Sequence, residues 1–195
     1  MEKPFIIING VEGLVGTDLA YKFNENGYKI CGLYDEAQDI QYKYKNSGLN
    51  NVADIVSIGD TSIENNCENI ISIVNRVNTK DVIYIHALGV YPLELTSVKN
   101  IKAKYKDQKE IEDMIENLSY NCFSSMTDAL SKTDKNVKLV FFSVIKDKYY
   151  NIKYEKWWSV ADKVKKYMND SLVKHKNLKF SILKISGVNT DKELL

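Results

Sequence analysis

Short apolar runs alternate with longer amphipathic stretches along most of the chain. The runs are rich in Ile, Val and Phe, which is typical of strands buried on both faces of a parallel sheet. They predict strands over Phe5–Asn9, Tyr28–Tyr34, Ala53–Ile58, Val82–Ala87, Val137–Val144 and Phe180–Ile185. The helical periodicity between them predicts helices over Thr17–Asn26, Ile63–Val77, Glu110–Ser131 and Trp157–His175. This alternation predicts the α/β class, with a doubly wound parallel sheet in three layers, α/β/α.

Nothing in this pattern divides the chain into parts. It contains no internal repeat, low-complexity tract or proline-rich linker, and 44% hydrophobic content over 195 residues is enough for one sizeable core. We therefore expect a single domain over residues 1–195.

The charge balance and hydropathy argue against two kinds of partner. Lys+Arg 27 and Asp+Glu 26 give a formal net charge of +1, so no strong attraction to nucleic acid or to a membrane surface is expected. No run approaches about 18 uninterrupted apolar residues, and the first residues (MEKP) lead into a strand-like stretch rather than a signal peptide. These features predict a cytoplasmic protein that binds neither nucleic acid nor membrane.

The three cysteines, Cys31, Cys67 and Cys122, are scattered along the chain. None belongs to a C-x-x-C pair, and no two flank a histidine at metal-ligand spacing. The sequence therefore predicts buried thiols in a reducing compartment and no metal site.

A glycine-rich turn follows the first predicted strand and precedes the first predicted helix, with the spacing G-x-x-G-x-x-G. In a dinucleotide-binding turn, one glycine allows a sharp bend, one lets the backbone approach a pyrophosphate and one allows close helix–strand packing. The helix N-terminus adds partial positive charge. Although glycines also form ordinary turns, this context predicts the nucleotide-binding unit of a Rossmann-like fold. The cofactor-binding residues predicted here are Gly10, Gly13, Leu14, Val15 and Gly16.

Two aspartates extend this prediction. Asp35 stands 19 positions after Gly16, at the end of the second predicted strand. A carboxylate there accepts hydrogen bonds from the ribose hydroxyls of NAD and repels the extra phosphate of NADP; the alternative is a surface turn. Asp60 follows the third predicted strand, where it either holds the adenine amino group or caps the next helix. Asp35 favours NAD over NADP as the cofactor.

With these motifs the chain resembles the short-chain dehydrogenase/reductase family over nearly all of its length. Asn9–Gly16 resembles the T-G-x-x-G-x-x-G fingerprint of the extended, epimerase-like branch, with asparagine in place of threonine. His86–Gly89 stands where the family has N-N-A-G, and Ser186–Thr190 resembles its P-G-x-x-x-T segment with serine in place of proline. Asn121 falls where the family has an asparagine in the helix beneath the active site. The resemblance adds to the cofactor site Ala87 and Gly89.

The catalytic motif of the family is altered in this chain. The family has a serine after the fifth strand and a Tyr-x-x-x-Lys on the next helix, whose lysine lowers the pKa of the phenol that transfers the proton. Ser143 corresponds to the serine or lies one position before it, whereas Trp158 falls at the tyrosine and Asp162 at the lysine. An indole cannot exchange a proton at neutral pH, and a carboxylate reverses the charge that the phenol needs. The resemblance therefore implies that the standard proton relay is missing.

Other residues are candidates to replace it. Tyr149–Lys153 contains a formal Tyr-x-x-x-Lys, but it begins six positions after Ser143, where a loop is expected. Tyr154 lies one helical turn before Trp158 and is the better substitute acid. His86, near the ligand-binding edge of the sheet, either faces a ligand or is a satisfied buried histidine. The catalytic residues predicted are Ser143, Tyr154 and Asn121.

Two functions follow as hypotheses. The first is a divergent NAD-dependent oxidoreductase or epimerase acting on a small polar or nucleotide-sugar-like substrate with a non-standard proton relay. The second is a catalytically inactive relative that binds NAD(H) as a structural ligand, sensor or partner subunit; a Rossmann-like domain without a nucleotide is a third. The resemblance further implies a short or absent C-terminal substrate lobe and a homodimer formed through the predicted helix Glu110–Ser131.

Overall fold

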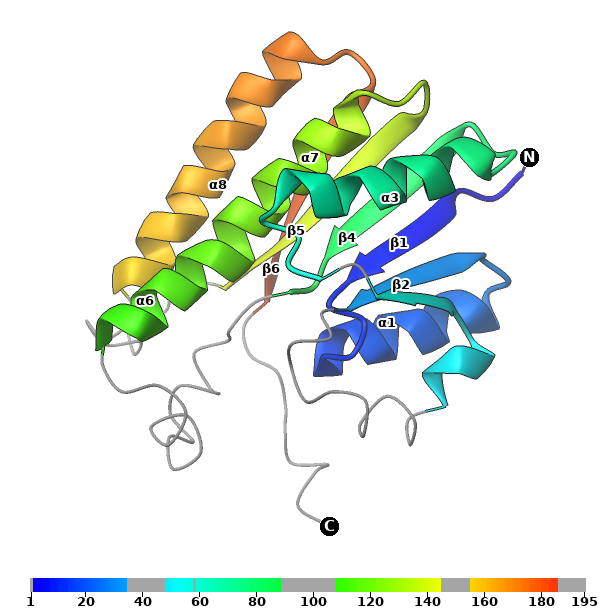
Figure 1. Cartoon of the computed structure of the whole chain (residues 1–195), viewed down its shortest axis with the longest axis horizontal. Helices are drawn as coiled ribbons and strands as arrows, with labels where there is room; N and C mark the ends of the chain where they lie inside the picture. Colours follow the sequence, from blue (N-terminus) through cyan, green and yellow to red (C-terminus); the bar gives the residue numbers. More distant parts are fainter. Residues whose placement is uncertain (1, 35–47, 58, 89–107, 145–154, 186–195) are drawn as a thin grey trace.

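Six parallel strands form one sheet in the computed structural model of the chain (Figure 1). The structure describes residues 2–34, 48–57, 59–88, 108–144 and 155–185. In spatial order the strands are β3 (Asp54–Ser57), β2 (Ile30–Tyr34), β1 (Phe5–Asn9), β4 (Asp81–His86), β5 (Asn136–Val144) and β6 (Leu178–Ile185). The chain thus winds outward in one direction from β1 to β3 and in the other from β4 to β6. This is the strand order of the Rossmann sheet, and it confirms the predicted fold class.

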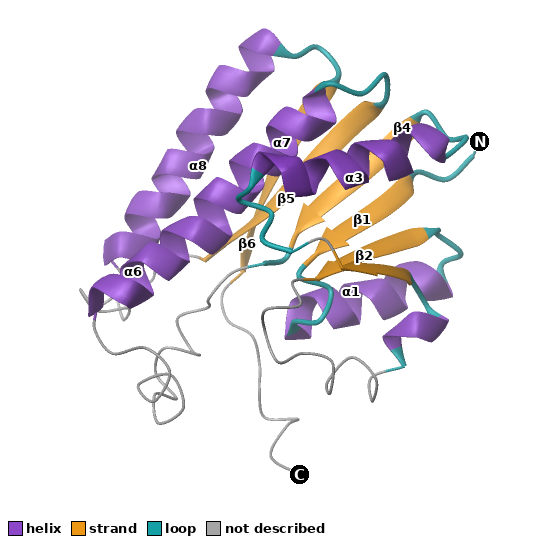
Figure 2. Cartoon of the chain, in the orientation of Figure 1, coloured by secondary structure: helices purple, strands orange, loops and turns teal. Residues whose placement is uncertain are grey.

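Helices cover both faces of the sheet (Figure 2). On one face lie α3 (Glu64–Arg76), α6 (Gln108–Glu116), η2 (Asn117–Asn121), α7 (Cys122–Ser131) and α8 (Glu155–Lys174). On the other lies α1 (Leu14–Glu25), and η1 (Leu49–Asn51) precedes β3. None of the helices in the described ranges is both long enough and apolar enough to cross a membrane.

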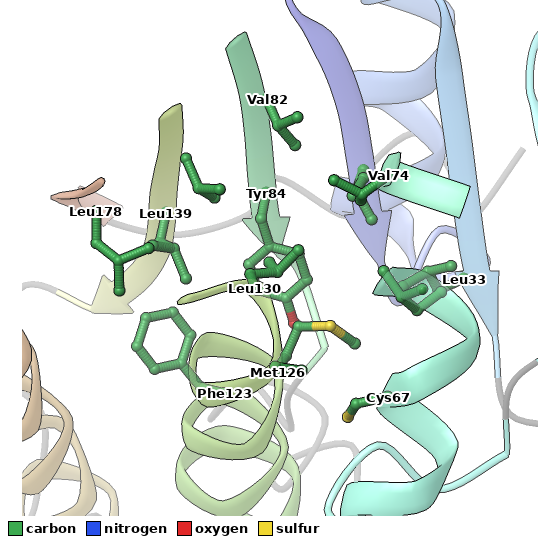
Figure 3. Close-up of a cluster of buried hydrophobic side chains, with 14 of the residues drawn as sticks. Leu33, Cys67, Val74, Val82, Tyr84, Phe123, Met126, Leu130, Leu139 and Leu178 are labelled. Carbon is green, nitrogen blue, oxygen red and sulfur yellow. The ribbon is translucent and has the colours of Figure 1, made fainter. Parts of the chain in front are cut away.

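Each face of the sheet has its own core. Figure 3 shows part of the larger one, in which Tyr84 of β4 and Leu139 of β5 lie against Phe123 and Met126 of α7. The smaller core joins the opposite sides of β1 and β4 to α1. Alternation along the strands explains this division, because successive side chains point to opposite faces.

The cysteines are buried free thiols, as predicted. Burial raises the pKa of Cys31 and of Cys122 to about 12 and that of Cys67 to about 11. All three are therefore protonated and unreactive at neutral pH.

The first helix begins three residues earlier than predicted, at Leu14 rather than Thr17. Gly13 has extended dihedral angles and serves as the N-cap, so the helix starts as soon as the turn is complete. Gly16 therefore lies in the first helical turn, not in the loop. At the other end, Gly27 has a positive φ of 70°, which ends the helix as predicted and delays β2 until Ile30.

The predicted helix Glu110–Ser131 is continuous but not regular. It consists of α6, the π-helical segment η2 and α7. A π segment inserts an extra residue into the helical turn, and such insertions concentrate at functional sites. Hydrophobic periodicity cannot locate the π segment, because one extra residue rotates the apolar stripe of the helix by less than a full turn.

Candidate functional site

The turn between β1 and α1 depends on glycine at two positions. Gly10 has a φ of 81°, and a Cβ atom there would lie 2.8 Å from the backbone nitrogen of Leu88. A Cβ atom on Gly16 would lie 2.1 Å from the Gly10 carbonyl oxygen. These two glycines therefore let the turn fold back on itself and lie against the backbone that follows β4.

Gly13 has a different role because it faces outward. It is exposed and extended, and the nearest atom to a Cβ placed there, the Gly10 carbonyl oxygen, is 3.3 Å away. As the N-cap of α1 it offers no side chain to the helix, and the first turn of α1 carries no acidic residue. The N-terminus of α1 thus begins at an exposed glycine, and helix N-termini attract anions.

Hydrogen bonds attach this turn to both neighbouring strands. The Gly10 amide donates to the Leu33 carbonyl of β2 at 3.0 Å, and the Ala87 amide donates to the Asn9 carbonyl at 2.9 Å. Strand order reverses between β1 and β4 at this point, which is where open parallel sheets bind ligands. Ala87 is buried beside the turn, and its contact with a cofactor stays a prediction.

The remaining predicted cofactor residues divide into two groups. The side chain of Val15 packs against the smaller core. Its backbone is therefore the part that a ligand at the N-terminus of α1 would meet. Leu14 is described only in its backbone. Asp35 and Gly89 lie outside the described residues.

Asp60 is turned toward the helical layer. Its Oδ1 accepts the Ser62 amide hydrogen at 2.8 Å, and its Oδ2 accepts the Asn117 amide hydrogen at 3.3 Å. Burial alone would raise the pKa of Asp60, but the hydrogen bonds from Ser62, Asn117 and Cys122 outweigh it and lower the pKa. Because α3 begins at Glu64 with Ile63 as its N-cap, Asp60 stabilises the turn before the helix instead of capping it. An adenine contact stays a prediction.

Asn121 is the last residue of η2, and its side chain donates to Asn117 Oδ1 at 3.2 Å. Asn117 in turn bonds Asp60, so the pair connects the π segment to the loop after β3. Sequence reasoning missed Asn117, although an asparagine four residues before Asn121 is a visible signal on a helix.

Ser143 lies within β5, not after it, and is 9% exposed. It belongs to the face of β5 that carries Leu139 and Phe141 into the larger core. Its register partner on β6 is Lys184, an exposed residue that sequence reasoning did not single out. By alternation from Phe180, Lys184 lies on the same face of the sheet. A hydroxyl and a cation are therefore neighbours at the carboxyl ends of β5 and β6.

Trp158 and Asp162, predicted to stand at the family's tyrosine and lysine positions, both lie on α8. Trp158 is half-buried and packs against a small cluster that includes Ile115 of α6 and Val160, in agreement with a core or pocket-wall interpretation. Asp162 is exposed. Tyr154 and Tyr149–Lys153 lie outside the described residues.

Two lysines of α8 are engaged elsewhere. Lys156 and Lys163 both bond the Glu116 carboxylate of α6, the latter at 2.6 Å. Their hydrogen bonds lower the pKa of Glu116 to about 2. This ion-pair group ties α8 to α6 and leaves neither lysine in the place of the family's catalytic one.

His86 is a satisfied buried histidine. Its Nδ1 lies 3.0 Å from the Tyr84 hydroxyl and its Nε2 lies 2.8 Å from the Leu118 carbonyl oxygen. The ring also stacks on Phe141, with centroids 5.7 Å apart. Burial lowers the pKa of His86 to about 4, so the ring is neutral at physiological pH. Of the two interpretations of His86, the structure supports the buried one.

The two glycine environments predict different costs of substitution. Gly16→Ala should lower the free energy of unfolding by at least about 2 kcal/mol, because its methyl group collides with fixed backbone. Gly13→Ala should lower it by about 1 kcal/mol or less, since alanine can adopt the extended dihedral angles there. Urea denaturation of the two variants measures both values, and equal losses would contradict the assignment.

Neutral His86 also predicts a pH dependence of stability. Its pKa is about 4 in the folded chain and near 6.5 when unfolded, so stability is complete above pH 6.5 and is lost as the pH falls toward 4. The His86 contribution to this loss is about 3 kcal/mol. Unfolding free energies of the wild type and His86→Gln between pH 7 and 4 measure it, with His175→Gln as the control for removing a histidine. Parallel curves for the wild type and His86→Gln would contradict it.

Comparisons with known proteins give a likeness of structure only. No protein-family model matches the chain, and no curated protein matches its sequence. An enoyl-[acyl-carrier-protein] reductase (NADH) from Aquifex aeolicus aligns with a TM-score of 0.71 over 97% of this chain and 75% of that chain, at 16% identity. A short-chain dehydrogenase/reductase from Vibrio parahaemolyticus gives 0.64 over 93% and 83%, at 14% identity.

A third structure, the enzyme WbmH from Bordetella bronchiseptica in complex with NAD+, gives a TM-score of 0.62 over 94% of this chain and 56% of that chain, at 14% identity. These likenesses agree with the strand order of the sheet. The chain therefore has the fold of the short-chain dehydrogenases and reductases.

Proposed function

We propose that the chain is a divergent short-chain dehydrogenase/reductase that binds NAD(H) at the turn from Gly10 to Gly16. The observation that carries the proposal is the exposed Gly13 at the open N-terminus of α1, beside the reversal of strand order. A pyrophosphate placed there would receive backbone N–H groups and the positive end of the helix dipole. The buried Gly10 and Gly16 hold the backbone in the conformation that this contact needs.

The proposed cofactor is NAD rather than NADP. Support comes from the position of Asp35 in the sequence, because a carboxylate at the end of the second strand bonds ribose hydroxyls and repels a 2′-phosphate. One structural neighbour is an enoyl-[acyl-carrier-protein] reductase (NADH), and another, WbmH, is in complex with NAD+. The glycine spacing favours the extended, epimerase-like branch of the family.

For chemistry we propose an oxidoreductase or epimerase acting on a small polar or nucleotide-sugar-like substrate. The bound cofactor would supply or accept the hydride. Ser143 would hydrogen-bond the substrate oxygen, and Lys184, its register partner on β6, would supply positive charge at the same edge of the sheet. This pair, with Tyr154 as the proposed acid, would replace the missing tyrosine and lysine.

The alternative is a protein that binds NAD(H) without catalysis, as a structural ligand, sensor or partner subunit. The observation that favours it is the environment of the α8 positions: Trp158 packs into a small core, Asp162 is exposed, and Lys156 and Lys163 are paired with Glu116. Within the described part of α8, no side chain matches the family's proton relay.

A homodimer through the helix α6–η2–α7 is part of the proposal. The exposed residues of that helix include Glu110, Asp113 and Asp128, so the contact would be largely polar. The molar mass at micromolar concentration tests it, and a monomeric mass would refute the dimer.

NADH binding tests the central proposal. Fluorescence titration should show that the wild type binds NADH more tightly than NADPH, and that Asp35→Ala reduces this preference. Gly13→Ala should bind NADH at least about tenfold more weakly while staying close to wild-type stability, because its methyl group occupies the approach of the phosphates. Absence of NADH and NADPH binding to the folded wild type would exclude the proposal.

Turnover then separates the two functions. Hydride exchange between NADH and carbonyl or nucleotide-sugar substrates should be lost in Ser143→Ala and Lys184→Met if the chain is an enzyme. NADH binding without any hydride exchange across the panel would favour the binding protein.

A further inference from the structure

A hydrogen-bonded ring, buried at Asn9, Tyr84 and His86 and partly buried toward the π segment, begins at the residue before Gly10. Its members come from β1, β4, the loop after β3 and the helix α6–η2–α7. They are Asn9, Asp60, Thr61, Tyr84, His86, Asn117, Leu118 and Cys122.

Elementary chemistry fixes the direction of the first bonds. The Leu118 carbonyl can only accept, so His86 Nε2 carries the hydrogen and donates it at 2.8 Å. In a neutral imidazole Nδ1 is then the acceptor, and the Tyr84 hydroxyl donates to it at 3.0 Å. The Tyr84 oxygen in turn accepts from the Asn9 amide group at 3.1 Å.

The same amide group continues the ring on its other side. Asn9 Nδ2 donates its second hydrogen to the Thr61 hydroxyl oxygen at 3.1 Å. Thr61 bonds the Cys122 sulfur, and the Cys122 thiol lies 3.7 Å from Asp60 Oδ1. Asp60 also accepts from Asn117, so the ring begins and ends on the π segment.

The position of the ring connects it to the turn. Asn9 and His86 are register partners on β1 and β4. The residue that follows each of them belongs to the proposed site. Gly10 follows Asn9, Ala87 follows His86, and a Cβ on Gly10 would lie within 3.1 Å of the Ala87 and Leu88 backbone. Any shift of one strand end against the other would therefore change the turn itself.

Asn9 supplies two donors that a threonine could not supply. A threonine hydroxyl has a single hydrogen, so it can donate to Tyr84 or to Thr61 but not to both. Asn9 is 2% exposed and Tyr84 is fully buried, so water cannot replace a lost bond at either position.

We propose that this ring positions the turn for the dinucleotide, with Asn9, Tyr84 and His86 as positioning residues; this rests on the proposed NAD(H) site. None of the three touches the cofactor. They act by keeping Gly10 and Gly13 in the binding conformation, and loss of a ring bond lowers the population of that conformation and raises the apparent Kd in proportion.

The test uses Tyr84→Phe and Asn9→Thr in the full chain, with Val74→Ala as the matched control. Tyr84→Phe removes one hydroxyl and keeps the aromatic ring in the core. Asn9→Thr makes the motif match the family fingerprint, so the resemblance alone predicts no harm. Val74 is fully buried in the same core on α3 and has no part in the ring.

The first readout needs no cofactor. In protein labelled with [15N]glycine, amide hydrogen exchange of Gly10 and Gly13, both hydrogen-bonded in the turn, is compared with that of Gly32 in the middle of β2. Tyr84→Phe and Asn9→Thr should speed exchange at the turn relative to Gly32 by at least about fivefold, and Val74→Ala should not. Equal acceleration in all three variants, or none at the turn, would overturn the proposal.

The second readout is binding. The two ring variants should raise the Kd for NADH about tenfold at a temperature where circular dichroism shows them folded, and Val74→Ala should leave it within about twofold. Unchanged affinity in both ring variants would also overturn the proposal. If exchange at the turn responds as expected but the wild type binds no NADH, the ring stands and the proposed function fails.

A third measurement uses the wild type alone and remains informative if a variant does not fold. The chain has 2 histidines, so imidazole 15N spectra are simple to assign. His86 should be the neutral tautomer with its hydrogen on Nε2 at pH 7. A hydrogen on Nδ1 would break the stated order of bonds and overturn the ring.

Discussion

The site depends on the close approach of two backbones at the carboxyl ends of β1 and β4. Gly10 leaves β1 with a positive φ, and a side chain there would strike the backbone at Ala87 and Leu88. Gly16 permits the equally close return of α1 over the Gly10 carbonyl. These contacts leave Gly13 as the accessible glycine of the turn, at the open end of a helix. The proposed anion site thus rests on the packing of backbone on backbone, before any side chain is considered.

Side chains then hold the ends of β1 and β4 together. They also give one explanation for two departures from the family fingerprint. Asparagine at position 9 and histidine at position 86 stand side by side in the sheet and share Tyr84 as a hydrogen-bond partner. Considered alone, each of these two residues looks like the loss of a family motif. As a buried set with matched donors and acceptors, they satisfy one another, which a buried polar group must do. Burial between Phe123 and Phe141 keeps His86 neutral, so its two nitrogens can serve as one donor and one acceptor.

Most of the fold is visible in the sequence because it rests on local periodicity. The strand runs, the left-handed Gly27 after α1 and the glycine turn all follow from chemistry within a few residues. The ring was not predictable in this way, since Asn9, Tyr84 and Asn117 are far apart in the chain and meet only through sheet register and the π segment. Lys184 was missed for the same reason: only the alignment of β5 and β6 brings it beside Ser143.

Cofactor binding and catalysis rest on different parts of this structure. The proposed nucleotide site is built from β1, α1 and the end of β4, where the glycine turn lies next to the hydrogen-bonded ring. The family's proton relay would come from α8, where lysines pair with Glu116 and an indole packs into a core. Gly10 adopts its left-handed conformation without strain and lies beside polar groups whose donors and acceptors are matched. The proposed nucleotide site therefore does not depend on whether the proposed chemistry takes place at Ser143 and Lys184 or is absent.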